Sequence, residues 1–324
     1  GFAVRSSAIG EDTLFSFAGQ YSTYLNIRGD QLIDRYRDVL ASKFSPKAIY
    51  YLLSHTLSES DLAMSVCCIT MVNAKTSGVI YTRDPVSPEE DCLLINSIYG
   101  LGKYLVDGTL MPDVFRVSRK EKTVQEFQLA KKTVRLVIQT GEGTIEEKVP
   151  DSEQELASIS DAQVGLLADI ALKIENHYGY PQDIEWAIDQ NDQIILLQTR
   201  PLHVMEVQIP SETPEPSELE IILSGGNTIC PGAGGGPVFR ASSANDLSRI
   251  PEGAVLVTTN PFPGLVTVLG KVSALVTEVG GVASHLATIA REYRIPTLMG
   301  VKNIEKLEDG QAVTVDATKA VVYS

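Results

Sequence analysis

The sequence predicts a two-domain protein in which helices and strands alternate, a fold of the α/β or α+β class. Three observations support this. The chain has 324 residues, whereas a single domain usually has about 100–200. Segments with the 3.6-residue period of a helix interleave with short apolar runs typical of strands. Residues 208–218 hold three prolines and three glutamates, a composition that cannot build a core. We therefore expect a linker at 206–220 between domains at 1–205 and 221–324.

The composition excludes several classes of protein. The chain is 44% hydrophobic, 21% charged and 6% aromatic, as expected of a globular protein and not of a disordered one. Its net charge of −14 disfavours nucleic-acid binding, because such proteins usually present a basic surface. No apolar run reaches the roughly 18 residues of a membrane span. The four cysteines lack CxxC spacing, which favours reduced thiols and a cytoplasmic protein. From the charge and the apolar runs we expect no nucleic-acid or membrane partner.

Two helices are expected early in the first domain. Residues 30–40 are amphipathic, and Asp30 can cap the helix that they form. Ser45-Pro46 then begins a second helix, because proline is favoured in a first turn. The expected buried stripe of the first helix consists of Leu32, Ile33, Tyr36, Val39 and Leu40.

Further along the first domain, residues 62–72 and 78–81 predict buried strands. Residues 161–178 have the length and period of a long helix. Its core side is expected to carry Leu166, Leu167, Ile170 and Ile174.

Residues 183–189 and 194–200 predict a β-hairpin. A two-residue turn at Asn191-Asp192 would place Glu185 opposite Gln198 and Asp183 opposite Arg200, all on one face. The other face would carry Ile184, Trp186, Ile188, Ile195, Leu197 and Thr199.

The polar face of this hairpin can bind a cation. Opposed Cβ atoms lie about 4.5–5.5 Å apart, so Glu185 and Gln198 can share one Mg²⁺, which prefers oxygen ligands and substrate phosphates. Arg200 can then meet a phosphate. The alternative is an ordinary half-exposed hairpin, which also shows one polar and one apolar face. A slip of one residue would also exchange the two faces.

The second domain contains a histidine at a predicted helix start. Residues 272–276 have the composition of a strand, and two glycines at 280–281 then allow a tight turn. Ser284 can cap the helix that follows, and Pro296 ends that element. The core stripe of this helix is expected to consist of Leu286, Ile289, Ala290 and Tyr293.

His285 therefore lies in a first helical turn, where free N–H groups and the positive end of the helix dipole would stabilise a phosphoryl group on its imidazole. A histidine nucleophile is chemically suited to neutral pH, because its ordinary pKa is about 6.5. The alternative is a histidine with a structural role or one that is simply exposed.

Several motifs of the second domain resemble one known family. The run TEVGGVASHLATIAREYRIPTLMG at 277–300 is similar to the phosphohistidine signature of enzymes that use phosphoenolpyruvate. The run CPGAGGGPV at 230–238 resembles the start of the same swivelling β/β/α domain, with Cys230 in place of a serine. Residues 307–316 are similar to its last strands. The resemblance implies that His285 receives a phosphoryl group from ATP and passes it on.

The first domain resembles the ATP-grasp nucleotide-binding domain of phosphoenolpyruvate synthase and pyruvate phosphate dikinase. The similar runs are VRSSA at 4–8, SGVIYTRDP at 77–85, DIEW at 183–186 and LQTRP at 197–201. The resemblance implies that Arg5 binds ATP phosphates and that Thr82 lines the phosphate site. It implies Mg²⁺ binding by Glu185 and Gln198, and support of the nucleotide by Asp183 and Arg200.

The chain also departs from the family pattern. The family's ATP-grasp domain begins earlier, with a lysine-bearing lobe, and a pyruvate-binding barrel follows its swivelling domain. We therefore expect an incomplete ATP-grasp domain, and we expect the chain alone to perform the whole reaction poorly. The glutamate of the family's G-L-G-E motif is Lys103 here, which reverses a charge near the nucleotide, and a glutamine of the adenine-side strand is Ile69.

The function that the resemblance implies is ATP- and Mg²⁺-dependent phosphorylation of His285, with onward transfer to pyruvate or a related acceptor. Two alternatives stay open. One is a phosphotransferase with a different acceptor, similar to rifampin phosphotransferase. The other is a degenerate, non-catalytic ATP-grasp scaffold, which Lys103 and Ile69 would explain.

Overall fold

The structure is a computed structural model that describes residues 1–8, 21–54, 63–205, 220–262 and 264–324. The expected linker at 206–220 lies almost wholly outside these residues. The chain divides into two compact units, the first formed by Gly1–Tyr104 with Pro112–Val204 and the second by Leu105–Met111 with Met205–Ser324.

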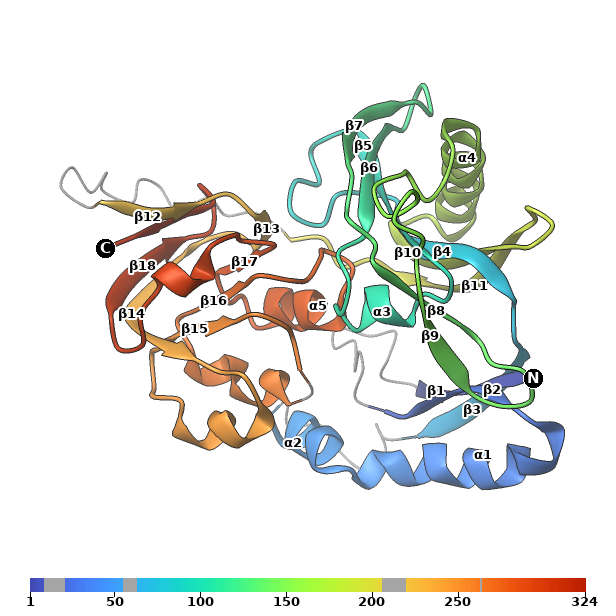
Figure 1. Cartoon of the computed structure of the whole chain (residues 1–324), viewed down its shortest axis with the longest axis horizontal. Coiled ribbons are helices and arrows are strands. Elements are labelled where there is room, and N and C mark those ends of the chain that lie inside the picture. The colour runs from blue at the N-terminus through green and yellow to red at the C-terminus, as the bar shows by residue number, and fades with distance from the viewer. Residues whose placement is uncertain (9–20, 55–62, 206–219, 263) are drawn as a thin grey trace. The chain divides into compact units, whose positions relative to one another are not determined.

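The first unit begins with a three-stranded antiparallel sheet in the order β2-β1-β3 (Figure 1). Val39 of the first helix packs against Val4 and Ile27 of this sheet. The second helix begins at Pro46, as predicted. The elements are β1 (Phe2–Ala8), β2 (Thr23–Ile27), α1 (Leu32–Ala41), α2 (Pro46–Ser54) and β3 (Met64–Thr70).

Three predictions for this region were wrong in whole or in part. Asp30 is not a helix cap, because it lies inside a 3₁₀ turn at Gly29–Gln31 and pairs with Arg28. Ile33 and Tyr36 of the expected buried stripe are exposed, since the small sheet covers only part of the helix. β3 is a strand, as expected, but it forms one edge of the sheet and is mostly exposed instead of buried.

The main element of the first unit is a six-stranded antiparallel sheet in the order β11-β10-β4-β5-β6-β7. The first unit also contains a separate two-stranded sheet, β8-β9. The short helix α3 (Lys103–Val106) spans the boundary at Tyr104 between the two units. The strands are β4 (Ala74–Tyr81), β5 (Cys92–Tyr99), β6 (Asp113–Ser118), β7 (Val124–Gln128), β8 (Val134–Ile138), β9 (Thr144–Lys148), β10 (Gln182–Asp189) and β11 (Ile194–Pro201).

Helix α4 (Asp161–Tyr178) covers one face of the large sheet, and we call this the α4 face (Figure 1). The helix has the predicted bounds, and Ser160 caps it by accepting from Gln163 N. Leu167 is buried as expected, but Leu166 is exposed, and the buried contacts come instead from Val164 and two alanines. The sheet residues of the α4 face include Ile80, Ile95, Phe115, Ile184 and Trp186.

The second unit is built on an eight-stranded sheet in the order β12-β19-β18-β14-β15-β16-β17-β13. Its four central strands, β14 to β17, run parallel, and the outer strands pair antiparallel. The elements are β12 (Ile221–Ser224), β13 (Asn227–Cys230), β14 (Ala233–Arg240), β15 (Val255–Thr258), β16 (Ala274–Thr277), α5 (His285–Glu292), β17 (Thr297–Met299), β18 (Ala312–Asp316) and β19 (Val321–Tyr323).

Two apolar clusters form the core of the second unit. One joins Val255, Val276 and Val315. The other joins Leu256 and Leu275 to three residues of the predicted α5 stripe, Leu286, Ile289 and Tyr293. Neighbouring residues along β15 and β16 thus alternate between the two clusters, so both faces of these parallel strands are covered.

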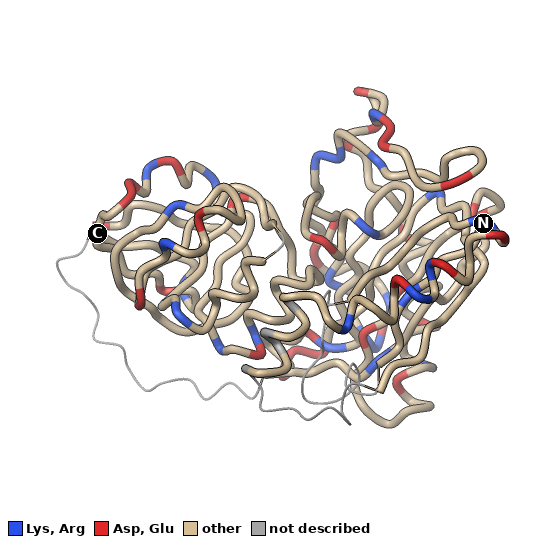
Figure 2. Tube along the Cα trace, turned by 90° about the horizontal axis from the view of Figure 1, so that it is seen from below, with Lys and Arg blue, Asp and Glu red and all other residues tan. Residues whose placement is uncertain are grey.

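Acidic and basic residues are interspersed along both units, with no block of one sign (Figure 2). No helix in the described ranges is long and apolar enough to cross a membrane.

Candidate functional site

The predicted hairpin forms from β10 and β11, but its turn is not the expected one. Asp189 N donates to Gln193 O at 3.0 Å, so the loop contains three residues, 190–192, instead of two. Asp192 adopts a left-handed φ of 58°. The Asp189 carboxylate accepts from Gln193 N and Asn191 N, and these hydrogen bonds lower its pKa. The carboxylate of Asp189 thus selects a three-residue turn.

A bulge in β11 compensates for the longer turn. Near the turn Trp186 lies opposite Leu196, but one step further Glu185 lies opposite Gln198. The extra residue is Leu197, which restores the predicted pairs, and Asp183 lies opposite Arg200 as expected. The predicted pairing of these four residues is therefore confirmed.

The bulge changes the predicted apolar face. Leu197 packs against Ala187 on the side away from α4, and Ile195 lies opposite Ala187. The prediction that Ile195 and Leu197 share a face with Trp186 was therefore wrong. Ile194 takes that place, since it packs with Trp186 in the core under α4.

The opposite side of the six-stranded sheet, which we call the polar face, carries four of the predicted site residues. Glu185, Gln198, Asp183 and Arg200 all project from it. Arg200 Nε donates to Asp183 Oδ2 at 2.8 Å. The charge of Asp183 raises the pKa of Arg200 against the effect of burial, with a further contribution from Glu185. This guanidinium thus keeps its positive charge beside the hairpin.

Arg5 of β1 extends toward the same place. Its Nη1 lies 3.8 Å from Glu185 Oε2, and both side chains are about a quarter exposed (26% and 29%). At this distance and exposure the pair is a weak interaction, which leaves both groups available to a ligand. The structure therefore brings together five of the seven predicted site residues.

Among these five residues, Gln198 has a side-chain acceptor that lacks a hydrogen bond. Its Oε1 is buried and has no hydrogen-bond partner among the described residues. Leaving a buried acceptor unpaired costs about 1–3 kcal/mol, so the atom calls for a partner that the chain itself does not supply. An amide oxygen directly opposite a carboxylate is a donor set that suits Mg²⁺. These residues therefore fit the implied metal.

The pair would supply only part of a coordination shell. The described residues contain no group of three or more His, Cys, Asp or Glu side chains that could hold a metal ion. Mg²⁺ is usually bound through one or two protein groups, with waters and substrate phosphates completing its octahedron. The hairpin thus has the character of a site that holds a metal together with a phosphorylated ligand.

Thr82 differs from its neighbours in the predicted site. It is buried, and its hydroxyl accepts from Gln182 N at 2.8 Å and bonds to Glu175. The hydroxyl therefore ties the end of β4 to β10 and α4. Its expected role at a phosphate stays a prediction.

Sequence reasoning missed the arginine that completes this link. Arg119 forms a bidentate pair with Glu175 at 2.8 and 2.9 Å and also donates to Thr82 O. Burial raises the pKa of Glu175, but the hydrogen bonds from Arg119 and Thr82 outweigh it and leave the pKa below its ordinary value. The two residues lie 56 positions apart, so no local pattern could have revealed the pair.

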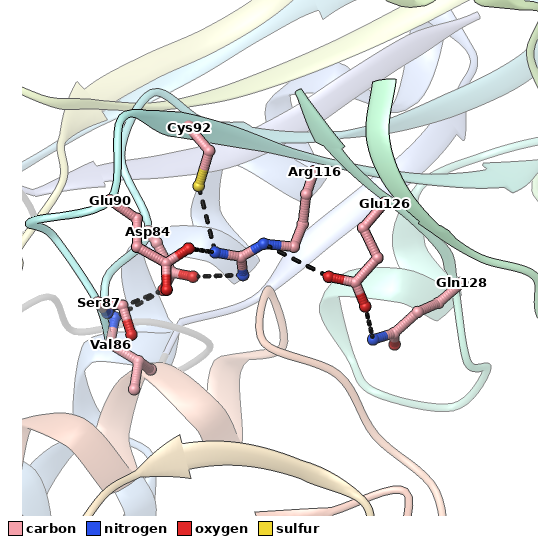
Figure 3. Close-up of polar contacts among 8 residues, drawn as sticks. All are labelled: Asp84, Val86, Ser87, Glu90, Cys92, Arg116, Glu126 and Gln128. Carbon is pink, nitrogen blue, oxygen red and sulfur yellow. Dashed lines mark hydrogen bonds and ion pairs between the residues drawn. The ribbon is translucent and has the colours of Figure 1, made fainter. Parts of the chain in front are cut away.

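A second arginine that the sequence reasoning missed anchors the loop after β4. Asp84 accepts from Val86 N and Ser87 N through one oxygen and from Arg116 through the other (Figure 3). Arg116 also contacts Glu90, Glu126 and Cys92 (Figure 3). Burial lowers the pKa of Arg116, but Asp84 and the other anionic neighbours raise it above the ordinary value. The loop that carries the TRDP motif is thus held in one shape.

His285 is the first residue of α5, as predicted. Ser284 caps the helix, and its Oγ accepts from Ala287 N at 3.3 Å. In the loop before this helix, Gly280 has a φ of 130°, a value that glycine adopts readily and other residues rarely do. Arg291 donates to Val282 O at 3.0 Å, which ties the glycine loop to the helix. The position is confirmed; the phosphoryl role of His285 stays a prediction.

Comparison with known proteins gives two family matches. Residues 1–220 match the pyruvate phosphate dikinase AMP/ATP-binding domain. Residues 250–320 match the mobile domain of PEP-utilising enzymes. The first match contains the ATP-grasp motifs, and the second contains the run at 277–300 and residues 307–316, whereas the run at 230–238 lies between the two matches.

Curated relatives share similarity along nearly the whole chain. A probable phosphoenolpyruvate synthase of Pyrococcus horikoshii is 38% identical over 99% of this chain and 40% of that protein. The phosphoenolpyruvate synthase of Pyrococcus furiosus is 37% identical over 99% and 40%. A probable phosphoenolpyruvate synthase of Archaeoglobus fulgidus is 36% identical over 99% and 43%. The chain thus spans about two fifths of the length of these relatives.

Proposed function

The chain belongs to the phosphoenolpyruvate synthase and pyruvate phosphate dikinase family, and from this we propose that its first unit binds ATP with Mg²⁺ and that His285 of the second unit accepts a phosphoryl group. Onward transfer to pyruvate completes the proposed reaction. The single observation that supports it best is the unpartnered Gln198 Oε1 opposite Glu185.

The polar face supplies what phosphoryl transfer requires, which is positioning and charge neutralisation more than covalent chemistry. Arg5 and Arg200 offer guanidinium groups to phosphate oxygens, and Arg200 is held in place by Asp183. Glu185 and Gln198 would hold Mg²⁺, which when bound neutralises charge on the transferring phosphate.

In the proposed step an imidazole nitrogen of His285 attacks a phosphorus atom of ATP. The N–P bond forms as the P–O bond to the departing nucleotide breaks, and the nucleotide oxygen keeps the electron pair. The imidazole releases its N–H proton, so the product is a neutral-ring phosphohistidine. The helix N-terminus at His285 would stabilise the negative charge of that group.

The acceptor is proposed from the relatives. The three relatives are named phosphoenolpyruvate synthase or probable phosphoenolpyruvate synthase and match this chain over 99% of its length, which supports pyruvate over an antibiotic acceptor. Transfer to pyruvate is a proposal, because the chain spans about two fifths of the length of those proteins.

Labelling with radioactive ATP tests the proposal. The protein expressed from its complete reading frame is incubated with labelled ATP and Mg²⁺, and acid-labile label is measured. We expect label in the wild type, strong reduction in Glu185→Gln, and none in His285→Ala. Label that persists in His285→Ala would refute the assignment of the nucleophile, and no acid-labile label in the wild type would refute the proposed activity.

A further inference from the structure

Asn96, in the centre of β5, is a buried polar residue that the fold does not explain. Its side chain is 0% exposed, and neither Nδ2 nor Oδ1 has a hydrogen-bond partner among the described residues. A buried carboxamide that makes none of its hydrogen bonds is costly, and most such groups in proteins are paired. An apolar residue of similar shape would serve the core better.

The sheet register shows where Asn96 points. Asn96 lies opposite Val79 of β4, and Val79 lies opposite Glu185 of β10. Glu185 in turn lies opposite Gln198. Residues directly opposite one another in an antiparallel sheet project from the same face. Asn96 therefore belongs to the polar face, in the same transverse row as the two residues that would hold Mg²⁺.

The neighbours of Asn96 within the sheet are apolar. Val79 and Val114 lie opposite it on the flanking strands, and Leu94 and Ile98 precede and follow it on the same face. None of these four side chains can donate or accept a hydrogen bond. The amide must therefore find its partner above the polar face.

Two other buried polar side chains of the first unit find their partners within the fold. The carboxamide of Asn26 donates to Gln139 O and Gly143 O, both at 2.8 Å. Ser77, on the polar face itself, donates to Gly100 O. Among the described residues, Gln198 and Asn96 are the carboxamides with an unpartnered buried atom, and they share one row.

We propose that Asn96 is a polyphosphate-binding residue, whose Nδ2 donates to a phosphate oxygen of a nucleotide bound with Mg²⁺ at Glu185 and Gln198. This inference rests on the proposed function. Two strand spacings separate Asn96 from Glu185, about 10 Å between Cα atoms. Side chains that project from the same face at that separation can both reach one metal–polyphosphate group. AMP lacks the polyphosphate, so its binding should not depend on Asn96.

The test compares two nearly isosteric substitutions that each remove an unpartnered polar group. Asn96→Leu acts on the polar face. Thr76→Val is the matched control, because Thr76 Oγ1 is also buried without a partner among the described residues but projects from the α4 face. Isothermal titration with Mg·ATP and with AMP measures affinity, and thermal unfolding without nucleotide measures stability.

We expect Asn96→Leu to weaken Mg·ATP binding about tenfold or more, as the loss of a hydrogen bond to a charged group does. AMP affinity should not change, and the unfolding midpoint should stay equal or rise. Asn96→Asp, which accepts but does not donate and adds negative charge, should lose more Mg·ATP affinity than Asn96→Leu. Thr76→Val should keep both affinities.

The outcomes separate this inference from the proposed function. Wild-type Mg·ATP affinity in Asn96→Leu, or an equal loss of Mg·ATP and AMP binding, would overturn the role of Asn96 alone. Absence of any nucleotide binding by the wild type and Thr76→Val would overturn the proposed function, and the role of Asn96 with it.

Discussion

The two faces of the six-stranded sheet differ in which buried polar groups lack partners among the described residues. On the α4 face these are Thr76 Oγ1 and Trp186 Nε1, whereas on the polar face they belong to the carboxamides of Gln198 and Asn96. The unpartnered carboxamides indicate a place where a ligand supplies the missing hydrogen bonds.

On the α4 face, Asp113 accepts from Lys132 Nζ at 2.6 Å and from Ser158 at 2.7 and 2.8 Å, and Asp113 and Lys132 are both fully buried. This pattern is that of a structural network.

The largest expected effect comes from breaking the network on the α4 face. Lys132→Met should destabilise the protein by about 3–5 kcal/mol, because it leaves the Asp113 carboxylate buried without its cation. Urea unfolding measures the change. The neighbouring Lys131→Met is the control: Lys131 is exposed and pairs with Glu155 on the surface, so its loss should change stability by less than about 0.5 kcal/mol. Equal effects of the two substitutions would contradict the account of this network.

The next largest effect concerns the Arg119–Glu175 pair. Glu175→Gln should cost about 1.5–3 kcal/mol at pH 7, because it removes a bidentate hydrogen bond to a charged group. The folded-state pKa of Glu175 lies below its ordinary value of 4.5, so this stabilisation is complete above pH 4.5 and is lost as the pH falls through the folded-state pKa.

Urea unfolding of wild type and Glu175→Gln between pH 7 and pH 3.5 measures this dependence. The stability difference between the two proteins should be constant at the upper end and shrink below pH 4.5. A difference that grew as the pH fell would show that the carboxylate is not stabilised by Arg119.

The smallest expected change in stability concerns two adjacent residues of β4, Ser77 on the polar face and Thr76 on the α4 face. Ser77→Ala should lose about 1 kcal/mol, because it removes the hydrogen bond to Gly100 O. Thr76→Val should be neutral or stabilising, since Thr76 Oγ1 has no partner among the described residues to lose. Thermal unfolding of the two variants checks this. Similar losses of stability in both variants would contradict the expected difference between the partnered hydroxyl of Ser77 and the unpartnered hydroxyl of Thr76.

The predicted hairpin pairs are correct, although the turn from which they were predicted is not the one that forms. An assumed two-residue turn at Asn191-Asp192, together with strand alternation, placed Glu185 opposite Gln198. The sequence did not reveal that Asp189 would cap a longer turn or that a bulge at Leu197 would correct the register. Two deviations of one residue cancel here, and strand alternation alone predicts neither.

Other parts of the site depend on contacts between distant segments. Arg116 and Asp84 are 32 positions apart, and their pairing follows from the order of β4, β5 and β6. Asn96 lies in an apolar strand and looks like an ordinary polar interruption until the register places it beside Val79. By contrast, Ser284 and His285 form a local cap, so the helix start was predictable from the sequence.

The central claim is that the row of Glu185 and Gln198 binds Mg²⁺ together with ATP, and Gln198→Leu tests it most directly. Isothermal titration measures ATP affinity of the wild type and the variant, each with Mg²⁺ and with EDTA. We predict that the variant folds with wild-type stability and binds ATP about tenfold more weakly than the wild type in Mg²⁺. In EDTA the two proteins should bind ATP with equal affinity. Equal ATP affinity of the two proteins in the presence of Mg²⁺ would contradict the claim.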